Sequence, residues 1–257
     1  MNNIQRKHLI KKKKKLLAFF NEVSSFDETS IIFSGDQNDE LLKKIKESTL
    51  ESLEKKRKIN DWILKLPGLS GRKYRVLINT LISKIDNPSY LEIGSYTGST
   101  ACAASANNVL KITCIDNWSQ FFFDGVDPHK EFNKNIKRCI LPKSKLKILS
   151  KDFRKVDFKK IDKHNIFLFD GPHHFEDHVE GITLAQPALQ DKFILIVDDW
   201  NWDQVRNGTF FALDNLNLEI VSKLEIRTTH DGSNSLASGE NSDWHQGYVF
   251  FVIKKKL

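Results

Sequence analysis

The chain has 257 residues, 40% of them hydrophobic and 28% charged, which supports a packed core in one large domain or one domain with an appendage. Its formal net charge of +7 is concentrated at the start, because residues 1–15 carry seven Lys or Arg and no acid. The remainder is close to neutral, which argues against a nucleic-acid-binding protein and leaves only weak attachment of the basic arm to RNA or an anionic surface open.

The first part of the chain has two segments with different hydrophobic patterns. Residues 1–37 have no sustained hydrophobic period, so we predict a flexible basic arm there. In residues 38–69 the apolar side chains recur mostly at spacings of three and four between Lys and Glu, up to the helix-breaking LPGLSG. This pattern predicts a helical extension in front of the main domain.

After Pro88 short apolar runs alternate with helical stretches. The runs are SYLEIG (89–94), LKITCID (110–116), KLKILS (145–150), NIFLFD (165–170) and KFILIVDD (192–199). Continuous apolarity of this kind is typical of strands in a parallel sheet that helices cover on both faces.

Two further runs near the end, LEIVSKLEIRT and GYVFFVIKKK, have no helix between them and flank a long polar loop. They predict an antiparallel pair that closes the edge of the sheet. We therefore expect residues 70–257 to form a doubly wound, Rossmann-like α/β domain, with seven mostly parallel strands and an antiparallel last strand.

Features of location and redox state are few. The chain has no run of 18 apolar residues, and the apolar stretch LLAFF in the basic start is too short for the core of a signal peptide. The cysteines Cys102, Cys114 and Cys139 lack the spacing of a metal site. We expect free thiols, a cytoplasmic location and no membrane span.

Carboxylates mark the end of every predicted parallel strand. They are Glu92, Asp116, Asp152, Asp170, and the pair Asp198 and Asp199. Ligands of open parallel sheets bind beyond these carboxyl ends. One such acid is explained by capping of the next helix, but a set that spans five strands indicates a ligand site.

The turn after the first strand of this sheet is EIGSYTGST, with Gly94 and Gly98 in G-x-x-x-G spacing rather than the G-x-G-x-x-G of dinucleotide folds. Glycines here allow a tight turn and a close approach of the backbone to a ligand. Asp116 ends the next strand, where a carboxylate can accept hydrogen bonds from two ribose hydroxyls, and Asp152 ends the third, where an adenine can be held.

Four segments, YLEIGSYTGSTACAASA, CIDNW, KDF and IFLFDGPHHFEDHVEGITLAQPALQDKFILIVDDWNW, resemble in order the motifs of class I S-adenosylmethionine-dependent methyltransferases. The likeness is greatest to small-molecule O-methyltransferases, namely the catechol O-methyltransferase type and the group with a D-G-x-H motif after the fourth strand. The resemblance implies S-adenosylmethionine as cofactor, bordered by Glu92, Gly94, Ser95, Tyr96 and Gly98 at the methionine part, Asp116, Asn117 and Trp118 at the ribose, Asp152 and Phe153 at the adenine, and Asp170.

Metal-dependent members of that group carry an aspartate at the end of the fourth strand and an Asp-Asp or Asp-Asn pair at the end of the fifth, and Asp170, Asp198 and Asp199 match these places. The resemblance thus implies a site for Mg²⁺, or for Mn²⁺ or Ca²⁺, which would activate an acceptor hydroxyl. Many similar enzymes work without metal. The alternative is that Asp199 caps the following helix and that Asp198 only touches the cofactor.

His173 stands where the D-G-x-H group carries its histidine, and neutral imidazole can take a hydroxyl proton. We predict it to be the general base or a residue that orients the ligand, with His174 as a weaker candidate. Glu176, Asp177 and His178 lie in the first turns of the next helix, where acids are favoured by the helix dipole. Near the last strand, His245 and the neighbouring Trp are placed to reach over a substrate.

The sequence therefore predicts methylation of a hydroxyl group on a small molecule, either a sugar or an aromatic compound, with divalent-metal assistance left open. Two alternatives remain: methylation of RNA or another macromolecule recruited by the basic arm, and a cofactor-binding module without activity. DGPHHF stands where amine-methylating nucleic-acid enzymes carry N/D-P-P-Y/F, which counts against the first alternative. A homo-oligomer is also left open.

Overall fold

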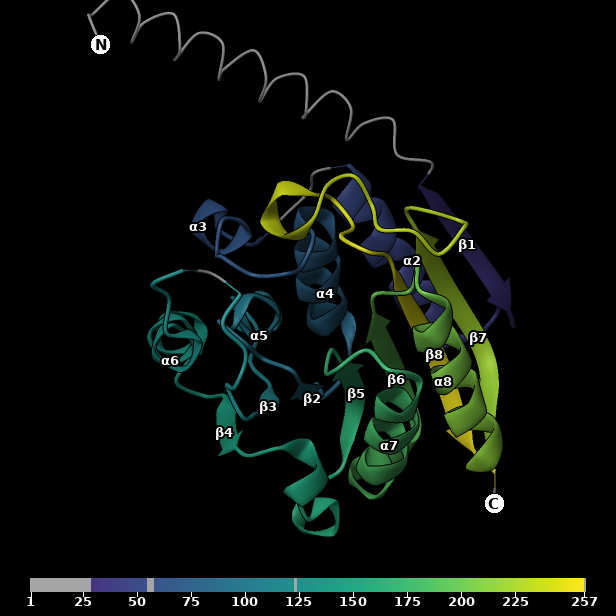
Figure 1. Ribbon diagram of the computed structural model, residues 1–257. Coiled ribbons are helices and arrows are strands. Elements are labelled where there is room, and N and C mark those ends of the chain that lie inside the picture. Colours follow the sequence, from purple (N-terminus) through teal and green to yellow (C-terminus); the bar gives the residue numbers. More distant parts are fainter. Residues whose placement is uncertain (1–28, 55–57, 123, 257) are drawn as a thin grey trace, which may run out of the picture.

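The structure is a computed structural model that describes residues 29–54, 58–122 and 124–256, and its centre is an eight-stranded sheet within these ranges (Figure 1). The strands are β1 (Ser30–Gly35), β2 (Ser89–Ile93), β3 (Lys111–Asp116), β4 (Lys145–Ser150), β5 (His164–Phe169), β6 (Leu189–Asp198), β7 (Leu218–Arg227) and β8 (Tyr248–Lys255). They lie in the order β1-β7-β8-β6-β5-β2-β3-β4.

Neighbouring strands from β4 to β6 pair in parallel, whereas β8 is antiparallel to both β6 and β7. The predicted doubly wound α/β fold is confirmed, and so is the antiparallel pairing of the last two runs. The pair differs from the prediction in one respect, because β8 lies inside the sheet, between β6 and β7, and does not form its edge.

The described part of the sheet has eight strands, where seven were predicted, because β1 is added at one edge. Strand β1 pairs antiparallel with β7 from Ser30 opposite Arg227 to Gly35 opposite Ser222. Ile31 and Phe33 alternate along it and pack against the core. The arm predicted for residues 1–37 is therefore corrected at this strand, which is too short to show a period in the sequence. The rest of the arm, residues 1–28, lies outside the described residues.

Helices cover both faces of the sheet (Figure 1). They are α2 (Glu40–Leu53), α3 (Asp61–Leu64), α4 (Arg72–Lys84), α5 (Ser99–Ser105), α6 (Pro128–Cys139), α7 (Phe175–Ala185) and α8 (Asp203–Asn215), with short 3₁₀ turns η2 (Phe153–Lys155), η3 (Phe158–Lys160), η4 (Gln186–Ala188) and η5 (Gly239–Asn241). Alternate strand residues divide between two cores, so that Leu168 faces α2 to α6 and Phe167 faces α7 and α8.

The predicted helical extension is two helices, α2 and α3, in the described residues. Asp39 caps α2, since its carboxylate accepts hydrogen bonds from the N–H groups of Leu41 and Leu42. Buried Leu42 and Ile45 lie on this helix, which packs against α4 and against strands β7 and β8. No helix in the described ranges is long and apolar enough to cross a membrane.

The polar loop between β7 and β8, residues 228–247, runs across the end of the sheet toward the start of α4 (Figure 1). The N–H groups of Arg72 and Lys73 donate to the carbonyls of Ser242 and Asp243, at 2.8 and 3.1 Å. These bonds fix the loop above the carboxyl ends of the parallel strands, where the sequence predicts a ligand.

Candidate active site

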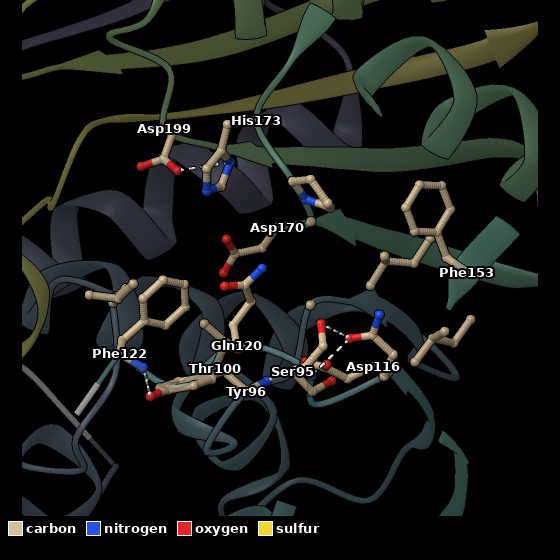
Figure 2. Close-up of a pocket in the computed structure, with 18 of the residues that line it drawn as sticks. Ser95, Tyr96, Thr100, Asp116, Gln120, Phe122, Phe153, Asp170, His173 and Asp199 are labelled. Atoms are coloured by element: carbon tan, nitrogen blue, oxygen red, sulfur yellow. Dashed lines mark hydrogen bonds and ion pairs between the residues drawn. The ribbon is translucent and has the colours of Figure 1, made fainter. Parts of the chain in front are cut away.

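A cavity of about 600 Å³ opens at the carboxyl ends of β2, β3, β4, β5 and β6 (Figure 2). The predicted site residues that line it are Gly94, Ser95, Tyr96, Asp116, Asn117, Trp118, Asp152, Phe153, Asp170, His173 and Asp199. Three other predicted residues, Glu92, Gly98 and Asp198, do not line it. Most of the predicted site is thus brought together, from five strand ends, around one space.

The turn after β2 is held tightly to the neighbouring strands. Gly94 donates its N–H to the carbonyl of Ile115, and Asp170 donates its N–H to the carbonyl of Ile93, both at 2.9 Å. The φ angle of Gly94 is +91°, and a Cβ at this position would lie 1.7 Å from the carbonyl oxygen of Asp170. Only glycine therefore permits this approach of the β2 and β5 ends, which forms the floor of the cavity.

Gly98 serves the helix rather than the cavity. It precedes α5 with a left-handed φ of +84°, and a Cβ there would lie 3.0 Å from the ring of Phe132. Gly98 does not line the cavity, and its predicted place beside the cofactor stays a prediction. Its missing side chain allows α5 to start directly after the turn and to pack on α6.

Asp116 forms a preorganised acceptor at one end of the cavity. Its Oδ2 accepts the N–H of Tyr96 at 2.7 Å, and its Oδ1 accepts the N–H of Trp118 at 2.6 Å. Both donors belong to residues with positive φ, +44° and +50°, whose backbone turns toward the carboxylate. Each oxygen keeps lone-pair capacity, so that the carboxylate can accept two further hydrogen bonds from a diol.

Glu92 lies beneath the turn and is fully buried. The Tyr90 hydroxyl donates a hydrogen bond to its Oε2. Burial raises the pKa of Glu92 to about 7, an effect that the Tyr90 hydrogen bond partly offsets. Glu92 does not line the cavity, and its predicted place beside the methionine part of the cofactor stays a prediction.

An aromatic wall stands at the end of β4. Asp152 accepts the backbone N–H of Arg154 at 2.9 Å and so starts the turn η2. The ring of Phe153 is buried, with an edge-to-face contact to Phe169, and the Arg154 guanidinium lies 4.5 Å from the centre of the Phe153 ring. An apolar ring beside a delocalised cation suits a flat aromatic ligand.

Asp170, which is partly buried and lines the cavity, interacts with Asp198, which is buried next to it. Although the cavity reaches Asp170, burial under the strand ends raises its pKa well above the usual range, and the charges of Asp198 and Asp199 add to the effect. Burial and the charge of Asp199 likewise raise the pKa of Asp198. The pair therefore retains a proton at a pH where isolated carboxyls are ionised.

The metal site predicted for Asp170, Asp198 and Asp199 is not found. Within the described ranges no group of three or more His, Cys, Asp or Glu side chains is arranged to hold a metal ion. Asp198 interacts with Asp170, whereas Asp199, with a left-handed φ of +54°, turns its carboxylate toward two histidines. The three carboxylates thus do not converge on one point, because of a backbone conformation that no sequence pattern indicates.

His173 and Asp199 form an ion-pair-like contact at the other end of the cavity from Asp116 (Figure 2). Nδ1 of His173 lies 3.2 Å from Oδ2 of Asp199, whose side chain is 5% exposed. A carboxylate beside Nδ1 fixes a proton on that nitrogen, so Nε2 is left to accept one. The ring also meets Trp202 edge to face, with centroids 5.3 Å apart.

The acids after His173 have helix roles, as the sequence predicted. Asp177 accepts the backbone N–H of His174 at 2.9 Å and completes a capping box at the start of α7. His178 is buried in the core, where burial lowers its pKa to about 3. Asp199 does not cap α8, whose N-cap Trp202 has no side-chain cap bond.

Sequence reasoning missed several polar lining residues of the loop between β7 and β8: Asn234, Ser238 and Gln246. His245 lines the cavity as expected, but Trp244 packs into the hydrophobic core. The polar composition of this loop was its main signal in the sequence. Its position over the site follows from the antiparallel pairing of β7 with β8, which a sequence pattern does not show.

Residues 91–200 match the sequence model of a family described as Methyltransferase domain (Methyltransf_24). No curated protein matches the chain. Among solved structures, TrmN from Thermus thermophilus is 12% identical with a TM-score of 0.45, over 71% of this chain and 49% of that one. The chain thus spans about half the length of TrmN.

Two further structures are O-methyltransferases. The S-adenosylmethionine-dependent O-methyltransferase of Thermotoga maritima is 13% identical, with a TM-score of 0.49, over 82% of this chain and 72% of that one. TomG of Streptomyces achromogenes, an O-methyltransferase of tomaymycin synthesis solved with its cofactor, is 12% identical, with a TM-score of 0.49, over 85% and 91%. Likenesses this weak do not identify a substrate.

Proposed function

We propose that this chain, whose residues 91–200 match a methyltransferase domain, transfers a methyl group from S-adenosylmethionine to a hydroxyl of a small molecule, a sugar or an aromatic compound. The observation that carries the proposal is the single cavity that joins the Asp116 carboxylate at one end to the His173–Asp199 pair at the other. One end is suited to a nucleoside and the other to removal of a proton.

The residues at the Asp116 end fit the cofactor. Two carboxylate oxygens, each already held by a backbone N–H, can receive the two hydroxyls of a ribose. Phe153 offers a flat apolar surface for adenine, and the turn at Gly94 brings backbone close to the methionine part. Ser95, from the same turn, also lines this part of the cavity.

The bound cofactor supplies an electrophilic methyl group on a positively charged sulfur. His173 would prepare the nucleophile, because its Nε2 can accept the proton of the acceptor hydroxyl. Asp199 holds the ring through Nδ1 and stabilises the positive charge that the imidazole gains. Trp202 limits the rotation of the ring from the side.

The acceptor end of the cavity supports a ligand with several hydroxyl groups or an aromatic ring. Its wall combines Trp202 with Asn234, Ser238 and Gln246, which offer hydrogen bonds of both kinds. Since the three aspartates do not converge, no step is assigned to a divalent metal.

Labelled S-adenosylmethionine tests the proposal. The protein is incubated with panels of sugars, phenols and RNA, with and without Mg²⁺, and label transfer to each is counted. We expect transfer to a sugar or phenol, and a loss of about 10²-fold or more in kcat for His173→Ala, the scale of general-base catalysis. Calorimetry should show that this variant still binds the cofactor. Transfer to RNA alone, or full activity of His173→Ala at every pH, contradicts the proposal.

A further inference from the structure

The ring of His245 has a defined tautomer. Its Nδ1 accepts the backbone N–H of Gly239 at 2.9 Å, so in the neutral ring the proton must be on Nε2. That nitrogen lies 3.5 Å from Oδ1 of Asp199. His245 is 6% exposed, and burial lowers its pKa, which keeps the ring neutral near pH 7. His245 therefore presents one N–H to the oxygen of Asp199 that His173 does not use.

The loop that carries His245 is held firmly. The backbone N–H of His245 donates to the Ser242 hydroxyl at 2.9 Å, and the carbonyl of His245 accepts hydrogen bonds from the hydroxyls of Thr228 and Ser235 at 3.2 and 2.6 Å. The φ angle of His245 is +47°, a left-handed value that non-glycine residues adopt only when their surroundings impose it. Asp199, at +54°, shares this strained backbone.

We propose that His245 is a positioning residue, which holds Asp199 through Nε2–H so that the carboxylate stays on Nδ1 of His173. The three side chains form a line, His245–Asp199–His173, in which each oxygen of the carboxylate faces one imidazole. The inference deepens the proposed function and rests on it for the role of His173, while the geometry of the line can be tested without activity.

The physical reason lies in the burial of Asp199. Its Oδ1 is buried and meets no hydrogen-bond partner at ordinary distance within the described ranges, so the N–H of His245 at 3.5 Å is the nearest compensation. Without that N–H, the carboxylate would form better hydrogen bonds by rotating toward water in the cavity. Rotation would release Nδ1 of His173, and the ring would lose the tautomer in which Nε2 accepts a proton.

Histidine tautomers are read directly from the ¹⁵N shifts of the ring nitrogens, which requires no substrate. In the wild-type protein, at a pH where both rings are neutral, we expect a protonated Nε2 on His245 and a protonated Nδ1 on His173. In His245→Leu, His173 should become a mixture of tautomers. An unprotonated Nε2 on His245 in the wild-type protein would overturn the proposal without any variant. An unchanged tautomer of His173 in His245→Leu would overturn it as well.

Kinetics then test the effect on catalysis. His245→Leu should lower kcat by about 10- to 100-fold, the range found for outer-shell partners of a functional group, with KM for the cofactor unchanged. His245→Gln, whose amide nitrogen can occupy the Nε2 position, should recover part of the loss. In the Asp199→Asn background His245→Leu should add little, because both changes act through one contact.

A matched control separates positioning from loss of any buried histidine. His164, 1% exposed at the start of β5, bonds Thr113 at the opposite end of the sheet from the cavity. His164→Leu should lower the melting temperature but leave kcat unchanged. Equal losses of kcat in His245→Leu and His245→Gln would show that His245 does not act through Asp199. The same follows if the fold-loss in kcat of the double variant is the product of the losses of His245→Leu and Asp199→Asn. If no variant or wild-type protein transfers methyl groups, the ¹⁵N result still decides the positioning proposal.

Discussion

Replacement of Glu92 by glutamine should stabilise the protein, and the gain should grow with pH. Glu92 is fully buried, and burial raises its pKa from the ordinary value of 4.5 to about 7. Between these values the folded protein binds a proton that the unfolded chain releases. The free energy of unfolding of the wild-type protein therefore falls as pH rises through this window.

The size of the effect follows from the two pKa values. A difference from 4.5 to about 7, at about 1.36 kcal/mol for each pH unit, amounts to about 3 kcal/mol once Glu92 is ionised. A glutamine side chain does not titrate, and its amide oxygen can still accept the Tyr90 hydroxyl. Asp170 and Asp198 are present in both proteins. Because the charge of Glu92 also raises the pKa of Asp170, its removal in Glu92→Gln changes the stability in the same direction as the loss of the Glu92 titration itself.

Urea denaturation of both proteins without ligand, at several pH values from 5 to 8, measures this difference. The advantage of Glu92→Gln should increase by about 2–3 kcal/mol across the range, most of it below pH 7.5. Parallel pH profiles for the two proteins would refute the reasoning, because they would mean that Glu92 ionises at the same pH in the folded and unfolded states.

Three further outcomes are expected. Asp116→Ala should lose about 1–3 kcal/mol of S-adenosylmethionine affinity by calorimetry, the scale of hydrogen bonds to a charged group, and unchanged affinity would be inconsistent with the ribose assignment. Gly94→Ala, whose Cβ would meet the Asp170 carbonyl at 1.7 Å, should lower the free energy of unfolding in urea titrations by more than Gly125→Ala does. Gly125 shares a positive φ, +72°, but has open space around the added Cβ, so its substitution should cost only the roughly 1–2 kcal/mol of a left-handed residue. A strong chelator should leave methyl transfer unchanged, and activity restored only by Mg²⁺ would contradict the arrangement of the three aspartates.

The parallel core of the fold and one end of the site could be predicted because both depend on short, continuous stretches of the sequence. Strands β2, β3, β5 and β6 are mainly apolar runs, whereas β4 alternates with Lys, and the last residues of these strands carry polar groups. Parallel strands bring these ends to one edge by geometry alone, so Asp116 and His173 could be placed at the same cavity without knowledge of any contact between them.

The remaining features depend on long-range pairing or on backbone angles that a sequence pattern does not contain. Strand β1 is defined by its partner β7 at the other end of the chain. The direction of the Asp199 carboxylate depends on a left-handed φ, which turns it to His173 and His245 and away from the two other aspartates. His245 reaches the site only because its loop is bound to the start of α4.

A crystal structure of the protein with S-adenosylhomocysteine, the demethylated cofactor, tests the central claim most directly. We predict both ribose hydroxyls on the Asp116 carboxylate, the adenine against Phe153 and the sulfur directed toward the space beside His173. A ligand that occupies another part of the surface, or that lies in the cavity with its sulfur turned away from His173, would contradict the account.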